Sequence, residues 1–360
     1  MTFRSPGPFV VPAVKAPRGP RGGEVIMRSG IRCRAFLALL LLPALLLAAR
    51  PAATQTVKIK MGSSLSPPSL DSITPYVAVE KGLFKKYGLD VEIIEFRGDA
   101  THTKALLAGE IDVSINMGAT SAIVSASKGA KIRLYMVAQP VTPYHFVARK
   151  EAGTTLQGLL GKNVAVSSIG AISYHIPRIV FERSGIDPDK MKYIAVGSPA
   201  DRFKALVAGK IDACVVTNTE AAKLAKYPDV VDLLQVSKVV PEIPYEFGVA
   251  RDDYIEKNPE TMYKLTKALI EANRWIMANK AGTVEIATKV MQGETAEDLS
   301  RAYDLTDPKV WGVNGEITEA AYKYTVDFLI KVGYMKEPVP YDKFFDRRFA
   351  DRALKELGRM

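Results

Sequence analysis

Five short polar segments supply the side chains best suited to hold a small ligand. Each follows a predicted strand, and four of them also open a predicted helix. The first N–H groups of a helix are unpaired and carry partial positive charge, so they bind anions and polar acceptors. In an α/β sheet such segments gather at the carboxyl edge of the strands. The five segments are 62–64, 97–102, 116–121, 167–173 and 217–220.

Four residues in these segments are candidates for direct ligand contact. Arg97 would pair with an anion, and His102 lies in the same segment. Ser64 and Gly118 are small, so a ligand can approach the backbone beside them. For each Ser, Thr or Asn in the segments, the alternative is that it only caps its helix. For Arg97 the alternative is an exposed side chain in water.

The residue types that dominate catalytic and metal sites are scarce. The three histidines are His102, His145 and His175, and their spacing matches neither HExxH nor a paired metal-ligand motif. GxxxxGK[ST], GxGxxG and GxSxG are also absent from the sequence. His145 and His175 are therefore predicted to be structural. We expect no catalytic residue, no metal ion and no cofactor.

Three other residues carry groups that can react. Cys214 lies in an apolar run, which predicts a buried and inert thiol, and the only other cysteine, Cys33, is near the N-terminus. Asp112 and Asp212 begin two matching strands. Two carboxylates are one route to acid–base catalysis. The simpler interpretation is that each Asp caps its own turn.

A ten-residue sequence that occurs twice predicts how the polar segments are positioned. Residues 104–113 and 204–213 are identical at seven of ten positions, 100 residues apart and without a gap. Each copy is typical of a helix end, a glycine in the left-handed conformation (Gly109 or Gly209) and an apolar strand. An accidental match is the alternative, since this connection is common. The flanking residues also correspond, which predicts two similar α/β units with a ligand site between them.

The alternation of strands and helices predicts a mostly parallel sheet. It continues as far as Val249, and beyond Pro259 only helical patterns follow. This helical tail is expected to pack on the first unit. Its predicted helices are 260–279, 283–291, 296–303, 318–332 and 343–357.

The chain is expected to cross between the two units twice, near residues 142–148 and 240–247. Lobe 1 would then comprise residues 54–146 and 246–360. Lobe 2 would comprise residues 147–245.

Composition is typical of a globular protein, with 360 residues, 48% hydrophobic and 24% charged. The net charge is +10, but residues 1–53 carry seven of these charges. No basic stripe with interleaved aromatic residues follows, which argues against nucleic acid as a partner.

The N-terminal stretch, residues 1–53, has the pattern of a leader. Three arginines precede an apolar run at 35–49, and small residues follow it, as in a secretory signal peptide. The run is short for a membrane-spanning helix, so a retained anchor is the less favoured alternative. Translation is expected to start at Met1 or at Met27. The mature chain would begin near residue 54 and be periplasmic.

Residues 79–91 (VEKGLFKKYGLDV) resemble a known family, the NMT1/THI5-like periplasmic substrate-binding proteins of ABC transporters. These transporters serve sulfonates, nitrate, taurine and pyrimidine precursors. The two repeat copies and residues 156–166 (LQGLLGKNVAV) match the family as well, and the similarity spans about residues 57–280. The resemblance implies a two-lobed α/β "Venus flytrap" with mixed, mostly parallel sheets, which closes on its ligand.

The resemblance also implies a partner and a set of ligand contacts. The partner is an ABC permease in the inner membrane. The sequence departs from the family in two ways: it lacks the aromatic residues that sulfonate binders often place near the binding loops, and it lacks the Cys-rich motif of eukaryotic pyrimidine-synthesising relatives. The family's binding loops would fall on Ser63, Gly98, Asn116, Thr120, Ser168, Ser173, Thr217 and Asn218.

These observations favour an exported, monomeric solute-binding protein without chemistry of its own. Its ligand would be a small organic anion, such as a sulfonate or carboxylate, or a heterocyclic precursor. One alternative is a lyase like the menaquinone-pathway enzymes that share the architecture, but those are cytoplasmic, which conflicts with the leader. Another is a ligand sensor that presents its closed form to a receptor. The identity of the ligand stays open.

Overall fold

The structure, a computed structural model, describes residues 56–360. The predicted leader and the alternative start at Met27 lie outside the described residues. The described residues all belong to a single compact unit. Among the described residues, no helix combines the length and the apolar character needed to cross a bilayer.

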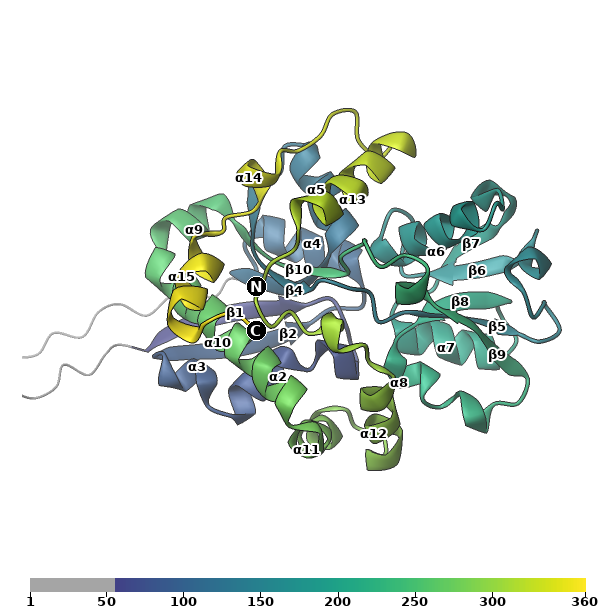
Figure 1. The fold of residues 1–360 in the computed structure, drawn as a ribbon, viewed down its shortest axis with the longest axis horizontal. Coiled ribbons are helices and arrows are strands. Elements are labelled where there is room, and N and C mark those ends of the chain that lie inside the picture. Colours follow the sequence, from purple (N-terminus) through teal and green to yellow (C-terminus); the bar gives the residue numbers. More distant parts are fainter. Residues whose placement is uncertain (1–55) are drawn as a thin grey trace, which may run out of the picture. The chain divides into compact units, whose positions relative to one another are not determined.

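The first lobe is built on a five-stranded sheet. Its strands are β1 (Val57–Ser63), β2 (Leu89–Glu95), β3 (Val113–Gly118), β4 (Ile132–Gln139) and β10 (Glu246–Arg251). Their order is β2-β1-β3-β10-β4. Strand β1 pairs in parallel with β2 and β3, and β10 runs antiparallel to β3 and β4. Strand β10 therefore returns from a distant part of the chain to complete this sheet (Figure 1).

The second lobe repeats this arrangement. Its strands are β5 (His145–Arg149), β6 (Asn163–Val166), β7 (Lys192–Ala195), β8 (Ala213–Val216) and β9 (Val230–Gln235), in the order β7-β6-β8-β5-β9. Strand β6 is parallel to β7 and β8, and β5 is antiparallel to β8 and β9. Both sheets are thus mixed and mostly parallel. The predicted two-lobed α/β fold is confirmed.

Within residues 56–360, seven α-helices precede the C-terminal region. In the first lobe these are α2 (Thr74–Glu80), α3 (Leu83–Lys86), α4 (Asp99–Ala108) and α5 (Ala119–Ser127). In the second lobe they are α6 (Ile172–Arg183), α7 (Pro199–Val207) and α8 (Asn218–Ala221). All residues of β3 and β8 are buried, as expected for strands covered on both faces.

The ten-residue repeat has the predicted conformation in both lobes. Helix α4 ends at Gly109, with φ 79°, before β3, and α7 is followed by Gly209, with φ 70°, before β8. Both glycines are in the left-handed region, where a Cβ would clash with the backbone. Helices α4 and α7 therefore occupy equivalent positions, as do β3 and β8.

The C-terminal region packs on the first lobe. Helix α10 contacts α2 and α15, α13 contacts α5, and α12 reaches α8 of the second lobe (Figure 1). The bounds are α9 (Asp252–Lys257), α10 (Pro259–Ala278), α11 (Lys280–Val290), α12 (Ala296–Leu305), α13 (Glu319–Lys331), α14 (Tyr341–Phe344) and α15 (Arg348–Leu357).

One predicted helix, 343–357, is wrong as a continuous element. The structure breaks it between α14 and α15, because this short segment joins the edge of the first sheet. Phe345 forms a bridge with Leu134 of β4, and the N–H of Asp346 donates to the Leu134 carbonyl at 2.8 Å.

Two segments connect the sheets. The first runs from β4 to β5 and the second from β9 to β10, so they comprise residues 140–144 and 236–245. The proposed division of the chain, with lobe 1 at 54–146 plus 246–360 and lobe 2 at 147–245, stays a prediction.

Candidate functional site

A small cavity lies where the two sheets face each other. Its volume is about 20 Å³, enough for roughly one water molecule. Both lobes and both connecting segments contribute to its wall. The lining residues are Ser64, Leu65, Gly98, Asp99, Tyr144, Ser167, Ile172, Ser198, Pro199, Arg202, Tyr245 and Glu246.

Arg202 is the cation of this cavity. It extends from α7 and is fully buried, with 0% exposure. Its Nε donates to the carbonyl of Val215 at 3.0 Å, and its Nη1 donates to the carbonyl of Gly197 at 2.6 Å. Its Nη2 has no hydrogen-bond partner within the described residues. Two carbonyls therefore hold the guanidinium in place and leave one nitrogen free for a ligand.

Asp99 faces the cavity from the first lobe and is well hydrogen-bonded. Its Oδ1 accepts from the N–H of Gly118 at 3.2 Å, and its Oδ2 accepts from the hydroxyl of Ser121 at 3.0 Å. Burial raises the pKa of Asp99, although those two bonds, the backbone N–H of Ile172 and the charge of Arg202 all lower it. The carboxyl thus lies within the electrostatic influence of both lobes.

Glu246 is the second acidic group of the cavity. It begins β10, is 2% exposed, and its Oε2 is buried without a partner in the described part of the chain. Burial raises the pKa of Glu246 well above its usual value, and the nearby carboxyls of Asp71 and Asp99 raise it further. Ionised Glu246 is therefore costly in this closed form unless a cation arrives.

The lobes touch around the cavity. A Cβ added to Gly98 would lie 3.6 Å from the Cβ of Ser167 in the opposite lobe. The N–H of Leu70 donates to Thr219 Oγ1 at 2.9 Å. The structure therefore represents a closed state, and a ligand larger than water requires the lobes to separate.

Charged pairs also join the two lobes. Lys223 Nζ lies 2.8 Å from Glu294 Oε1, and Lys226 pairs with Asp298. Both lysines follow α8, and both acids belong to the segment around α12. These pairs stabilise the closed arrangement at the edge of the cleft.

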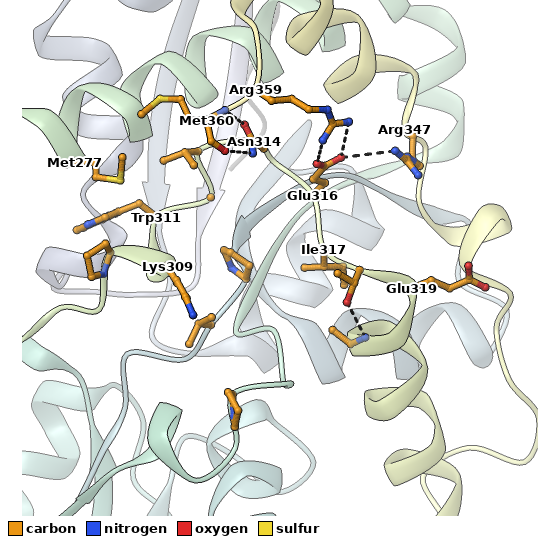
Figure 2. Close-up of a pocket in the computed structure, with 18 of the residues that line it drawn as sticks. Met277, Lys309, Trp311, Asn314, Glu316, Ile317, Glu319, Arg347, Arg359 and Met360 are labelled. Atoms are coloured by element: carbon orange, nitrogen blue, oxygen red, sulfur yellow. Dashed lines mark hydrogen bonds and ion pairs between the residues drawn. The ribbon is translucent and has the colours of Figure 1, made fainter.

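A larger groove of about 1010 Å³ lies beside the connecting segments, at Pro140 and Pro241. In Figure 2, Glu316 lies between Arg347 and Arg359 and pairs with both. Asn314 donates to the carbonyl of Met360 at 2.8 Å. None of the buried, unpaired polar atoms of the described residues belongs to this groove. The interlobe cavity is therefore the better candidate for a specific polar ligand.

Comparison with known proteins assigns the fold to a family. Residues 70–282 match the model of the family described as NMT1/THI5 like. The chain belongs to the NMT1/THI5-like family. The resemblance inferred from residues 79–91 is thereby confirmed.

Relatives of this NMT1/THI5-like chain include the binding protein YtlA of Bacillus subtilis (strain 168). The two are 25% identical over 299 residues, covering 78% of this chain and 86% of YtlA. The taurine-binding periplasmic protein of Escherichia coli (strain K12) is 26% identical over 197 residues, covering 54% of this chain and 60% of that protein. Among solved structures, the aliphatic sulphonate binding protein SsuA of Escherichia coli has the same fold, with a TM-score of 0.64 and 17% identity over 82% of this chain and 99% of SsuA.

The structure of the NMT1/THI5-like chain brings two of the sequence-predicted residues to the cavity wall, Ser64 and Gly98. Ser63 and Asn116 lie directly behind it. Asn116 Nδ2 donates to Ser63 Oγ at 3.1 Å, and Ser64 Oγ donates to the carbonyl of Asn116 at 2.7 Å. The N–H of Ser64 also donates to Asn116 Oδ1 at 2.8 Å, so the Asn116 side chain positions the Ser64 backbone.

The other predicted residues of the first lobe lie elsewhere. Arg97 is exposed, and Thr120 is buried with its hydroxyl unpaired. Gly118 donates its N–H to Asp99. His102 is packed beneath β1, where burial lowers its pKa to about 4, and it does not line the cavity.

In the second lobe, the predicted residues mostly serve the local structure. Ser173 Oγ accepts from the N–H of Ser167, which lines the cavity, and Ser168 is partly exposed. Thr217 forms a capping box with Glu220. Asn218 Nδ2 donates to Thr306 Oγ1 at 2.8 Å, between α8 and the end of α12. Asn218 and Thr217 therefore lie near the lobe contact and not on the cavity wall.

Sequence reasoning missed the charged residues of the cavity: Asp99, Arg202 and Glu246. One signal could have found Arg202, because Arg202 and His102 lie two residues before the two copies of the repeat and are therefore equivalent. Both residues are 0% exposed. Glu246 has no such signal, since only the return of β10 brings it to the site.

The groups best suited to nucleophilic or metal chemistry do not reach the cavity. Burial raises the pKa of Cys214 to about 12 and lowers the pKa of His175 to about 3. His145 Nδ1 lies 2.6 Å from Asp232 Oδ2, and neither residue lines the cavity. Within residues 56–360, no cluster of three or more His, Cys, Asp or Glu side chains could hold a metal ion.

Proposed function

We propose that this chain is the extracytoplasmic solute-binding component of an ABC importer. It closes its lobes on a small solute with an acidic group, or on a heterocyclic precursor, and delivers it to a permease of the inner membrane. In this proposal the leader exports the chain, which acts as a periplasmic monomer. Family membership supports the proposal, as do relatives whose names state that they bind taurine and aliphatic sulphonates.

One observation carries the proposal: the buried guanidinium of Arg202, whose Nη2 has no partner. A buried charged donor without an acceptor costs several kcal/mol, and at a cavity wall an acidic ligand can remove that cost by accepting from it. Because Arg202 belongs to the second lobe and Ser64 and Asp99 to the first, a solute between them would contact both lobes. Contacts of this kind drive hinge closure.

We also propose that the chain performs no chemistry on its solute. The cavity wall holds no Cys or His, and its hydroxyl and carboxyl groups come without a paired base and nucleophile. The buried Cys214 thiol has a pKa too high for thiolate chemistry near neutral pH. A sensor for a receptor would use the same binding step.

Thermal unfolding of the compact unit Thr54–Met360 against a panel of solutes tests the proposal. The panel holds alkyl sulfonates, taurine, nitrate, aromatic carboxylates, and pyrimidine and thiamine precursors. A solute at 100 times its Kd adds about 2.7 kcal/mol of stability, which is a shift of a few degrees for a protein of this size. The solute should be recovered unchanged after incubation. Conversion to a product would instead establish an enzyme.

Two variants connect any binding to the cavity. Arg202→Gln should abolish the stabilisation by the solute. Lys204→Gln should preserve it, because Lys204 is exposed on the same helix two residues away. Binding that survives Arg202→Gln in a folded protein would place the solute elsewhere.

A further inference from the structure

Two opposite kinds of unpaired group face the interlobe cavity. On the side of the second lobe, Arg202 offers Nη2 as a free donor. On the side of the first lobe, Glu246 offers Oε2 as a free acceptor. Both side chains are at least 98% buried, with exposures of 0% and 2%. In the closed state, bulk water therefore does not reach either side chain.

The first-lobe side of the cavity also has more carboxyl groups than the cavity has cations. Asp99 lies beside Glu246 on the cavity wall, and Asp71 lies behind it with its Oδ1 buried and unpaired. Gln139 Nε2 donates to the carbonyl of Asp71 at 2.6 Å and is a neutral neighbour. Arg202 is the single Arg or Lys on the cavity wall in the described chain. One cation therefore faces two wall carboxyls and a third behind them.

Resting on the solute-binding function proposed above, we infer that the solute is a compact zwitterion. Its acidic group binds Nη2 of Arg202, and its protonated amine binds the carboxylate of Glu246. The chemical class is a short-chain amino acid in the broad sense, with a sulfonate, carboxylate or phosphonate as the acid. Such a solute joins the lobes through one charge-assisted bond to each.

A solute with only one charge fits less well. A simple anion satisfies Arg202 but brings its charge near Asp99 and leaves Glu246 unpaired, which keeps the desolvation cost of that carboxyl. A simple cation satisfies Glu246 and leaves Nη2 of Arg202 without an acceptor. Arg202 and Glu246 line the same small cavity, so a short spacer between the two charges is enough to reach both.

The test compares compounds that share a two-carbon chain. Taurine and β-alanine carry both charges, ethanesulfonate and propionate carry only the acid, and ethylamine carries only the amine. Calorimetric titration of the wild-type chain should show that at least one zwitterion binds roughly tenfold to hundredfold more tightly than its single-charge counterparts. The measured quantity is the ratio of dissociation constants within each matched set.

Two variants identify the groups responsible. Glu246→Gln keeps the shape and removes the charge, so it should abolish the preference for the zwitterion over the acid. Arg202→Gln should abolish the preference for the zwitterion over the amine. Glu319→Gln is the control, because Glu319 is exposed at the start of α13 and does not line the cavity.

Each outcome bears on the inference separately from the proposed function. Equal or tighter binding of the acid-only compounds, lost in Arg202→Gln, overturns the zwitterion and leaves the solute-binding function standing. Binding of ethylamine that is as tight as that of the zwitterions, or tighter, also overturns the inference, because the acidic group would then contribute nothing. If none of the five compounds binds while another solute of the wider panel does, the inference is also overturned. A preference that persists in a folded Glu246→Gln variant removes Glu246 from the site and overturns it as well.

Discussion

Asp112 and Asp212 make the same hydrogen bond in the two lobes. Asp112 Oδ2 accepts from the N–H of Lys60 in β1 at 2.8 Å, and Asp212 Oδ2 accepts from the N–H of Asn163 in β6 at 2.8 Å. The N–H of each Asp donates back to the carbonyl of the same partner. The matched aspartates therefore tie β1 to the start of β3 and β6 to the start of β8. Each aspartate therefore does more than cap its own turn.

This relationship predicts similar losses of stability from matched substitutions. Asp212→Ala should lower the free energy of unfolding by about 1–2 kcal/mol, because the N–H of Asn163 loses its acceptor. Asp212→Asn should lower the free energy of unfolding by less, since the amide oxygen still accepts the hydrogen bond. The same two substitutions at Asp112 should have similar effects. Asp90→Ala, at an exposed position of β2, is the control and should stay within about 0.5 kcal/mol. Urea denaturation measures all of these, and a loss from Asp212→Ala no larger than the control would contradict the prediction.

The buried carboxyl of Asp71 predicts a pH-dependent stability. Burial and the Glu220 carboxyl raise the pKa of Asp71 to about 6, although Ser69 and Gln139 lower it. Between about pH 4 and pH 6 the folded protein keeps a proton that the unfolded chain has released. The stabilisation is therefore fully present below about pH 4 and is lost as the pH rises through 6.

Asp71→Asn mimics the protonated form and should remove this dependence. The variant and the wild type should be equally stable near pH 3, and the variant should be more stable by about 2–3 kcal/mol at pH 7.5. Urea denaturation of both proteins at the two pH values gives the comparison. Neighbouring carboxyls of Glu220 and Glu246 are common to both proteins. Parallel pH profiles would show that Asp71 does not titrate as described.

The bond between Leu70 and Thr219 predicts a variant that opens the lobes. Thr219→Val keeps the shape but removes the acceptor of the Leu70 N–H, which is buried in the closed state. In the open state water can satisfy that N–H, so closure should become less favourable by about 1–2 kcal/mol. Small-angle X-ray scattering should show a larger radius of gyration without ligand. Thr288→Val, on the exposed face of α11, should leave it unchanged. An unchanged radius in Thr219→Val would contradict the prediction.

Asp346, which lies in the break between α14 and α15, should be important for the stability of the fold. Asp346 Oδ2 lies 3.0 Å from Arg133 Nη1 and 2.6 Å from Arg348 Nη2, and its side chain is 4% exposed. Asp346→Asn should cost about 2 kcal/mol, as expected for buried charge-assisted bonds. Asp351→Asn removes an exposed pair with Arg347 and should cost less than about 0.5 kcal/mol. Thermal denaturation distinguishes them, and equal losses would refute the argument.

Several elements of the fold were predictable because their signals are local. The glycines of the repeat, Gly109 and Gly209, end helices for a steric reason that involves only adjacent residues. The helical pattern of residues 260–279 that predicted α10 likewise acts over a few turns of the chain. The break between α14 and α15 was not predictable, because the partner that causes it, Leu134, is far away in sequence.

The sequence predicted which backbone segments line the cavity, but it did not predict which side chains do. The segments containing Ser64, Gly98 and Ser167 line the cavity because they follow strands of the two sheets. Small polar side chains drew attention to these segments, but many of them, such as Thr217 and Ser173, bond within their own lobe. Two of the charged residues of the cavity, Arg202 and Glu246, lie outside the five polar segments. The third, Asp99, lies within segment 97–102 but was not among the candidate residues.

The sequence alone determined the family, the two-unit plan and the equivalence of positions 100 residues apart, because these depend on short patterns that repeat. Only the tertiary structure decided which side chains meet. Arg202 and Glu246 reach one cavity because α7 packs against β8 of the second sheet and β10 returns to the first sheet. Their unpaired atoms become significant only once both lobes exclude water from them, and burial of that kind is a property of packing and not of local sequence.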